Sequence, residues 1–271
     1  MRVTIQIASK DRSSELGLLL QSLRMQTYQD FDVMILDDAS GTLMSSFYYL
    51  ISMMRRLRCE GHGVSLIRNG VSYGVCEARN LLLKEDRYKN DYILRLDDDV
   101  VLEPDYIERL INVIKQGYDM ASGVTPMLVQ PEIKRDVKFI KPIANKIEFD
   151  NEGNMINIGD DCGVSYIQSE IIPAHQLRSC FMFKRDIYTK SNIKFELGLG
   201  TVGFREESIF CIRAAYEGYK IAVDTGAIAW HLHTPSGGVR TQDYQQQVKF
   251  GDLYFRKWAK EQYLKRGNPF K

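Results

Sequence analysis

The first half of the chain alternates short apolar runs with segments in which apolar residues recur every three or four positions. Apolar runs of this length predict buried strands, and the helical spacing predicts amphipathic helices between them. Strands are expected at residues 3–8, 31–36, 64–68 and 92–96, and helices at residues 14–25, 47–57 and 76–84. Such alternation predicts an α/β fold with a mostly parallel sheet and helices on both faces.

The second half has a different pattern. Residues 127–170 are polar and lack helical periodicity, which predicts long loops and short antiparallel strands. A central strand is expected within residues 177–184, a helix at residues 208–217, and two strands at residues 221–223 and 227–230. The tail, residues 241–271, has the spacing of one long amphipathic helix.

Composition excludes several classes of protein. The 271 residues carry 36 basic and 35 acidic side chains, and a net charge of +1 gives no general attraction to nucleic acid. No apolar segment has the length of a membrane-spanning helix, and the N-terminus runs directly into a strand rather than a signal peptide. A cytoplasmic protein is therefore expected. The five cysteines form no CxxC pair, which favours small buried thiols over a disulfide framework.

Three consecutive aspartates, Asp97, Asp98 and Asp99, end the apolar run at residues 92–96. Neighbouring carboxylates repel one another unless a cation screens them. Oxygen ligands suit Mg²⁺ and Mn²⁺, and these ions often keep open positions for the phosphate oxygens of a substrate. The cluster therefore favours a divalent metal that holds a diphosphate. A solvated turn before the helix that begins near Pro104 is the purely structural alternative.

Polar residues also follow the other predicted strands. Residues 9–12 come directly after the first strand, and Asp37 and Asp38 end the second. In a parallel α/β sheet, ligands bind outside the carboxyl ends of the strands. The three polar strand ends are therefore expected to meet in one crevice.

Five short pieces of sequence, in a fixed order between residues 3 and 240, carry a family resemblance. They are QTYQDFD before LDDAS, GVCEARN, LDDD with Pro104 following, FREE continuing to Arg213, and His231 ahead of PSGG. In this order the chain resembles the family 2 glycosyltransferases, inverting GT-A enzymes that take a sugar from a nucleotide diphosphate donor. The resemblance implies a GT-A, Rossmann-like sheet flanked by helices, with a smaller antiparallel acceptor-side region and a C-terminal helix.

The resemblance also implies a donor site. Asp38 would accept the N–H of a uracil ring, and Arg79 would stack on the base or bind phosphate. Asp97 and Asp98 would contact the ribose, the sugar or a metal-bound water. Three weaker candidates complete the donor residues: Arg12, Arg240, and Ala8, which stands where a polar residue is more usual.

Metal binding and catalysis are implied for three further residues. Asp99 would bind Mn²⁺ or Mg²⁺ directly, and the imidazole of His231 would complete the metal site. Glu207 would be the general base that takes the proton of the acceptor hydroxyl. The family usually has Glu-Asp where this chain has Glu206 and Glu207, so the base is one methylene longer. Stabilisation of a helix N-terminus is the structural explanation of the same acidic pair.

We therefore expect a metal-dependent glycosyltransferase that uses a nucleotide diphosphate sugar, with UDP as the expected nucleotide. The acceptor would be a glycan, a lipid-linked group or another hydroxyl. Residues 1–240 would form the glycosyltransferase domain, with 1–125 as the nucleotide-binding half and 126–240 as the acceptor-binding half. Residues 241–271 would be a helical extension that packs on this domain, and peripheral contact with a membrane surface is left open.

Two other functions also remain open. A sugar-1-phosphate nucleotidyltransferase shares the parallel sheet and the metal-binding carboxylates. Residues 8–12 lack the glycine-rich loop that this class ordinarily has after the first strand, which disfavours it. A catalytically silent carbohydrate-binding protein on the same fold would need neither a metal nor a base, yet the chain has candidates for both.

Overall fold

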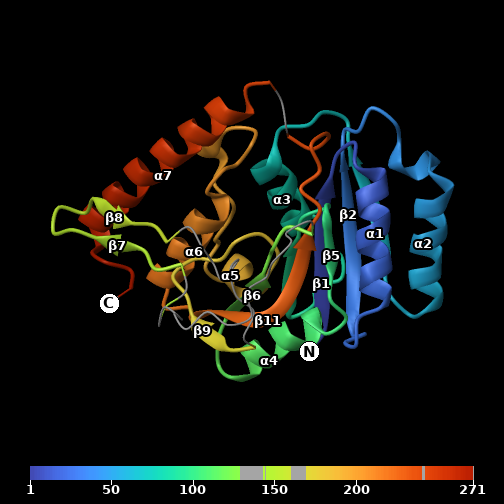
Figure 1. Ribbon diagram of the computed structural model, residues 1–271, viewed down its shortest axis with the longest axis horizontal. Coiled ribbons are helices and arrows are strands. Elements are labelled where there is room, and N and C mark those ends of the chain that lie inside the picture. The colour runs from blue at the N-terminus through green and yellow to red at the C-terminus, as the bar shows by residue number, and fades with distance from the viewer. Residues whose placement is uncertain (129–142, 144, 160–168, 240–241, 271) are drawn as a thin grey trace.

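The computed structural model describes residues 1–128, 143, 145–159, 169–239 and 242–270. Within these residues nine strands form one sheet in the order β3-β2-β1-β4-β10-β6-β11-β5, with β9 paired to the start of β11 (Figure 1). A separate pair, β7 and β8, lies apart from this sheet. None of the helices in the described ranges has the length and apolar character needed to cross a membrane.

The parallel part of the sheet confirms the prediction for the first half. Four strands form it, in parallel pairs: β1 (Val3–Ser9), β2 (Phe31–Asp38), β3 (Val64–Asn69) and β4 (Tyr92–Leu96). In this register Ser9 lies opposite Asp37, and Asp38 lies opposite Asn69. The polar strand ends therefore meet at one edge of the sheet.

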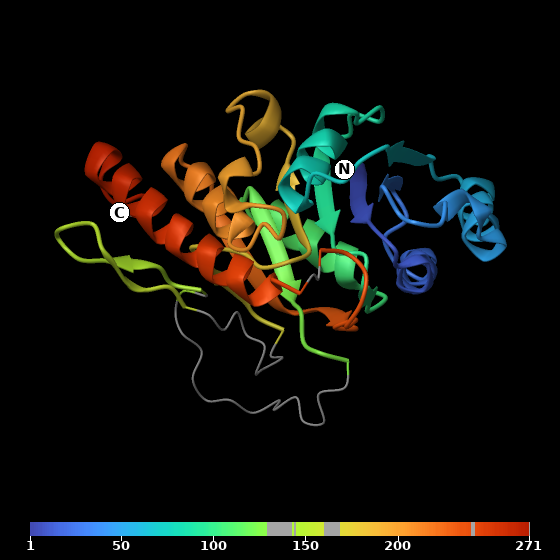
Figure 2. The same cartoon turned by 90° about the horizontal axis from the view of Figure 1, so that it is seen from above.

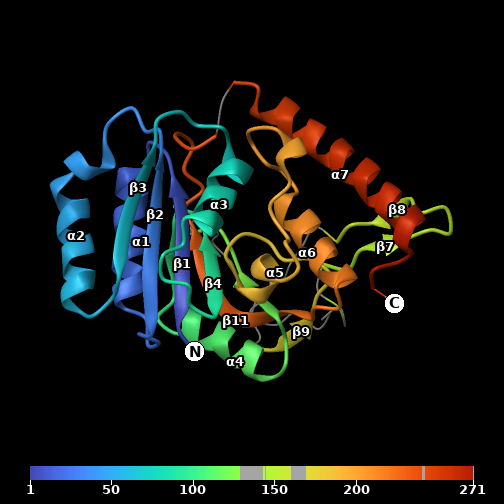
Figure 3. The same ribbon diagram turned by 180° about the vertical axis from the view of Figure 1, so that it is seen from behind.

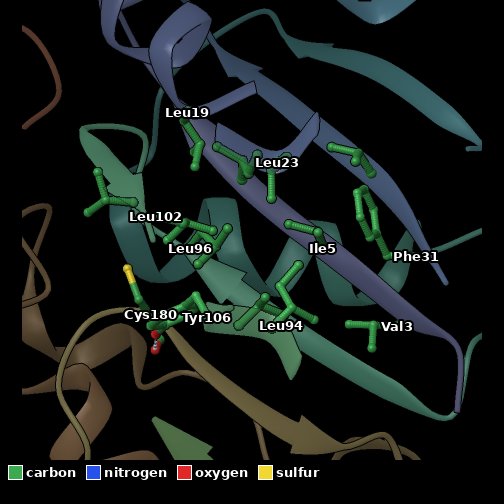
Figure 4. Packing of buried hydrophobic residues seen from close by; sticks show 14 of the residues in the cluster. Val3, Ile5, Leu19, Leu23, Phe31, Leu94, Leu96, Leu102, Tyr106 and Cys180 are labelled. Atoms are coloured by element: carbon green, nitrogen blue, oxygen red, sulfur yellow. Dashed lines mark hydrogen bonds between the residues drawn. The ribbon is translucent and has the colours of Figure 1, made fainter. Parts of the chain in front are cut away.

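The helices of the first half cover both faces. They are α1 (Ser13–Arg24), α2 (Tyr48–Cys59), α3 (Val75–Lys84) and α4 (Tyr106–Lys115), with a 3₁₀ turn η1 (Met44–Ser46) before α2. Successive side chains of a strand point to opposite faces. Phe31 accordingly joins the core under α1, α2 and α4, where Leu19 and Leu23 meet Ile5 (Figure 4). Met34 faces the other way and packs against α3.

The second half adds strands of both directions. The expected central strand is confirmed as β10 (Phe181–Lys184), which lies antiparallel between β4 and β6 (Met120–Val124). The sequence pattern gives no sign of β6, whose three central residues are Ala, Ser and Gly, or of β5 (Val100–Leu102), which has only three residues. The tertiary structure alone makes these segments strands.

The two strands expected at residues 221–223 and 227–230 are one strand, β11 (Ile221–His231), and this prediction was wrong. The intervening Asp224, Thr225 and Gly226 have the composition of a turn. They are buried in a strand whose register shifts between Val223 and Ile228. The Asp224 carboxylate accepts the Gly226 N–H at 2.8 Å, which satisfies this polar stretch inside the sheet.

The C-terminal helix lies at the opposite end of the molecule from α1 and α2 (Figure 2). The remaining elements are β7 (Glu148–Phe149), β8 (Met155–Asn157), β9 (Ile171–Pro173), α5 (Asp186–Thr189), η2 (Leu197–Leu199), α6 (Glu206–Tyr216) and α7 (Tyr244–Arg266). α7 is shorter than predicted because Gly267, with φ of +80°, ends it. Phe149 of the β7–β8 hairpin packs against Tyr263 of α7, with ring centres 5.1 Å apart.

The cysteines agree with expectation at three positions and disagree at one. Cys76, Cys180 and Cys211 are buried thiols. Cys59 is exposed, because it is the last residue of α2 and faces solvent. Cys162 lies outside the described residues.

Candidate active site

A cavity of about 690 Å³ opens at the carboxyl ends of β1, β2 and β4. Its walls come from α3, from the start of α6 and from the end of β11. Every residue predicted for the site lines this cavity except Arg240, which lies outside the described residues. The structure thus brings together side chains that are far apart in the sequence.

Asp97 lies between two arginines in the cavity wall. Its Oδ1 accepts a hydrogen bond from Arg79 Nη2 at 2.9 Å and is 3.2 Å from Arg95 Nη2. Burial would raise the pKa of Asp97, but the charges of Arg95 and His231 outweigh burial and hold the pKa below its ordinary value. The neighbouring positive charge therefore favours the ionised form of Asp97.

Asp98 and Asp99 share one guanidinium group. Arg12 Nη1 donates to Asp98 Oδ1 at 2.9 Å and lies 3.1 Å from Asp99 Oδ2, and Ser9 Oγ donates to Asp98 Oδ2 at 2.7 Å. Burial raises the pKa of Asp98 to about 7 against the opposing effect of Arg12. Arg12 supplies part of the positive charge that adjacent buried carboxylates require.

The other nitrogens of Arg12 hold the segment that follows β11. Nε donates to the Ser236 carbonyl at 3.0 Å, and Nη2 donates to the Thr234 carbonyl at 3.3 Å. Gly237, with φ of +74°, packs so closely that a Cβ there would lie 2.7 Å from Arg12 Cγ. Arg12 therefore fixes the aspartates relative to the PSGG piece. A direct contact of Arg12 with a donor stays a prediction.

Asp99 and His231 have the types and spacing of two ligands to one cation. Asp99 Oδ1 lies 3.6 Å from His231 Nε2. Asp99 Oδ2 is 3.1 Å from Arg12 Nη1 but makes no hydrogen bond with the described residues. Oxygen and imidazole nitrogen together suit Mn²⁺. In the part of the chain that the structure describes, no group of three or more His, Cys, Asp or Glu forms a metal-binding cluster. Substrate or water oxygens would have to complete the coordination.

The ring of His231 carries one further constraint. Its Nδ1 accepts the backbone N–H of His233 at 2.8 Å. In a neutral imidazole this bond places the proton on Nε2, so coordination through Nε2 requires the ring to release the bond and change tautomer.

The sequence pattern does not single out Arg95, although it lies at the centre of the site. Arg95 is 3% exposed, and its Nη2 is 2.7 Å from Glu206 Oε1 and 3.8 Å from Glu207 Oε1. The same nitrogen contacts Asp97, so Arg95 lies between the aspartate cluster and α6. A charged residue inside an apolar strand needs buried partners, and that is the sequence signal that could have revealed it.

Glu206 and Glu207 are neighbours with different environments. The Glu206 side chain is 2% exposed and is paired with both Arg79 and Arg95. The Glu207 side chain is 21% exposed, lines the cavity, and lies at the longer distance from Arg95. Both glutamates line the cavity, but Glu206 is part of a buried ion-pair network, whereas the more exposed Glu207 can meet a molecule there.

Asp37 and Asp38 also differ. Asp38 lines the cavity and accepts hydrogen bonds from Asn69 Nδ2 at 2.7 Å and from Ser72 Oγ at 2.5 Å. Asp37 accepts the backbone N–H of Ser40 at 2.9 Å and pairs with Arg68. Asp37 therefore stabilises the turn after β2, and Asp38 is the one placed toward the site.

The fold is similar to that of solved sugar-transferring enzymes. The crystal structure of GalNAc-T7 with UDP, GalNAc and Mn²⁺ matches with a TM-score of 0.67 and 12% identity, over 97% of this chain and 50% of that one. A mannosyltransferase from Pyrobaculum calidifontis, in complex with GDP-Man and Mn²⁺, matches with a TM-score of 0.58 and 15% identity, over 100% of this chain and 67% of that one. At these identities the likeness shows the fold alone, which is that of the GT-A glycosyltransferases.

The sequence comparison gives the family. A family model described as glycosyl transferase family 2 matches residues 4–206, most of the chain, and the chain belongs to that family. An uncharacterized glycosyltransferase of Haemophilus influenzae is 32% identical over 117 residues. That match covers 42% of this chain and 35% of the relative, so the chain corresponds to about a third of the relative's length.

Proposed function

We propose that this protein transfers a sugar from a UDP-sugar to a hydroxyl acceptor with inversion at the anomeric carbon. The observation that carries the proposal is the composition of one cavity. It holds an aspartate cluster next to an imidazole and, across Arg95, a glutamate at the start of a helix. The first group suits a metal-bound diphosphate, and the second suits a general base.

The donor would bind on the aspartate side. Asp99 and His231 would hold Mn²⁺ or Mg²⁺, which when bound neutralises charge on the leaving diphosphate. Two solved proteins of similar fold contain Mn²⁺, one with UDP and one with GDP-Man. They support a metal in the site, but they differ in the nucleobase of the donor, which is uracil in one and guanine in the other. Asp38 lies at the end of β2 within the cavity, where its carboxylate would accept a ring N–H of the nucleobase. The choice of uracil follows the family resemblance.

Glu207 would act on the acceptor. An inverting transfer needs a base on the face of the sugar opposite the leaving UDP, where it takes the acceptor hydroxyl's proton as the new bond forms. Glu206 is paired with Arg79 and the buried Arg95, which leaves Glu207 as the carboxylate at the start of α6 that can do so. The acceptor, whether glycan or lipid-linked, stays a prediction, as does its binding by residues 126–240.

Thermal-shift measurements with UDP, GDP, dTDP and a panel of their sugars, with and without Mn²⁺, test the proposal. A ligand that binds the folded state raises its apparent stability. UDP compounds should raise the midpoint more than GDP or dTDP compounds, and only with Mn²⁺ present. NMR of the released sugar should then show an inverted anomer. Stabilisation by GDP compounds would contradict uracil as the nucleobase. No stabilisation by any nucleotide would contradict a nucleotide sugar as the donor.

A further inference from the structure

The helix that carries Glu207 begins from a strained residue. Arg205, directly before Glu206, has φ of +74° and ψ of 13°, the left-handed region that residues other than glycine rarely adopt. Such a conformation costs about 1–3 kcal/mol and persists where neighbouring groups hold it. The conformation of Arg205 sets the orientation of the first turn of α6, and therefore the directions in which the Glu206 and Glu207 side chains point.

Two of the groups that contact Arg205 come from the C-terminal helix, and another is the ring of Phe204, whose centre lies 4.9 Å from the guanidinium. Arg205 Nε donates to Asp252 Oδ1 of α7 at 2.9 Å. Its guanidinium also lies over Phe255 of the same helix, 5.8 Å from the ring centre. The backbones approach closely here, since a Cβ on Gly251 would lie 2.8 Å from the Phe204 carbonyl oxygen. α7 thus contacts the turn before α6 through both side chain and backbone.

α7 contacts the rest of the same segment as well. Gln247 Oε1 accepts hydrogen bonds from Thr201 Oγ1 at 2.7 Å and from the Val202 N–H at 3.3 Å. On the other side, the Thr201 carbonyl accepts the Val75 N–H of α3 at 3.0 Å. The segment leading to Glu207 is therefore held between α7 and α3, two helices that Figure 3 shows on the same side of the sheet.

We propose that Asp252 is a positioning residue for the transfer reaction, which it serves by holding Arg205 in the conformation that turns Glu206 into the core and Glu207 into the cavity. The inference rests on the proposed role of Glu207. It assigns a part in the reaction to α7, which lies beyond residues 4–206, the range of the family match. A displacement of a reacting group by about 1 Å can cost about 100-fold in rate.

Asp252→Asn tests the inference, with Arg256→Gln as the matched control. The asparagine keeps the volume and loses the charge. Arg256 binds the other oxygen of the same carboxylate at 2.8 Å, so its replacement leaves the bond to Arg205 in place. The assay is release of UDP from the UDP-sugar that gives the largest thermal shift, with water as the acceptor. Water attacks the anomeric carbon, the bond to the diphosphate breaks, and Glu207 takes the water proton.

Asp252→Asn should lower kcat by about 10- to 100-fold while the KM for the donor and the affinity for UDP with Mn²⁺ stay within about twofold. Arg256→Gln should leave all three unchanged. Equal losses in both variants, or a loss confined to the melting temperature or to UDP affinity, overturn the inference. A wild type that consumes no UDP-sugar contradicts the proposed function instead, so the two failures are distinguishable.

A glycine at position 205 separates positioning from simple packing. Glycine adopts the left-handed conformation without strain, so it keeps the turn without help from Asp252. Adding Asp252→Asn to Arg205→Gly should therefore change kcat by less than about twofold. If Arg205→Gly does not fold, Arg205→Asn replaces it, because asparagine also tolerates this conformation. An undiminished effect of Asp252→Asn in that background contradicts the inference.

Discussion

The two sides of the cavity are built differently. On the aspartate side, Asp97, Asp98 and Asp99 are held by arginines that come from the parallel part of the fold, at distances of 2.9 to 3.2 Å. On the glutamate side, Glu207 is 3.8 Å from Arg95 and follows a turn that α7 contacts. Binding and turnover should therefore depend on different residues, and variants of each side should separate the two.

The largest effect is expected at Glu207. Glu207→Gln keeps the volume of the side chain but cannot accept the acceptor proton, so kcat should fall by about 10²–10⁴-fold. Calorimetry should show unchanged affinity for UDP with Mn²⁺.

Glu206→Gln is the control within the same turn. It removes one of the two carboxylates that pair with Arg79 and Arg95 and leaves Asp97 as their remaining partner. The free energy of unfolding should therefore fall by about 1.5–3 kcal/mol in urea titrations. Loss of turnover from Glu206→Gln in a folded protein, with Glu207→Gln active, would show that the base is the neighbouring residue.

The next effect is expected on the aspartate side. Asp99→Ala removes the carboxylate that faces His231, so Mn²⁺ should no longer strengthen UDP binding. A drop of about 100-fold in UDP affinity at saturating Mn²⁺ is expected from calorimetry. Wild-type affinity in the variant would remove Asp99 from the metal site.

A smaller effect is expected at His231, the second proposed ligand of the metal. His231→Ala should lower turnover by about 10-fold at low Mn²⁺, and excess Mn²⁺ should restore most of it because the loss lies in metal affinity. Titration of activity against Mn²⁺ measures this. An activity that stays low at saturating Mn²⁺ would place His231 outside the metal site, consistent with its bond to the His233 N–H.

The smallest effect is expected at Asp38. Asp38→Ala would remove the proposed hydrogen bond to the nucleobase, so UDP should bind about 5- to 10-fold more weakly while pyrophosphate binding is unchanged. Calorimetry with both ligands decides it. Equal weakening of UDP and pyrophosphate would mean that Asp38 supports the loop through Asn69 and Ser72 rather than the base.

The sequence predicted the parallel half well because each element there has its own apolar period. It also located the carboxylates, since strand ends in such a sheet converge whatever the loops do. β5, β6 and the continuous β11 were not predictable in this way, because small, polar or very short segments become strands only through their neighbours.

The site residues that the sequence did not predict were missed for the same reason: their roles depend on contacts with distant parts of the chain. Arg95 is visible in the sequence as a charge within an apolar run, but its partners Glu206 and Glu207 come from the far half of the chain. Asp252 gives no local signal, because its role depends on where α7 packs. The Arg12 side chain likewise points toward the PSGG piece because it contacts Ser236, which is more than two hundred residues away in the sequence.

The place of β10 in the sheet has a consequence for biosynthesis. β4 and β6 are joined through β10, which is made long after both, and Phe181 must pair with Arg95 and Ser122 to close the sheet. Pairing over such separations is slow because loop closure precedes any gain in contacts. While the chain is emerging, β4 and β6 would expose unpaired edges that can template aggregation. A fragment ending at residue 125 would keep those edges permanently, so residues 1–125 alone should not accumulate as a folded unit.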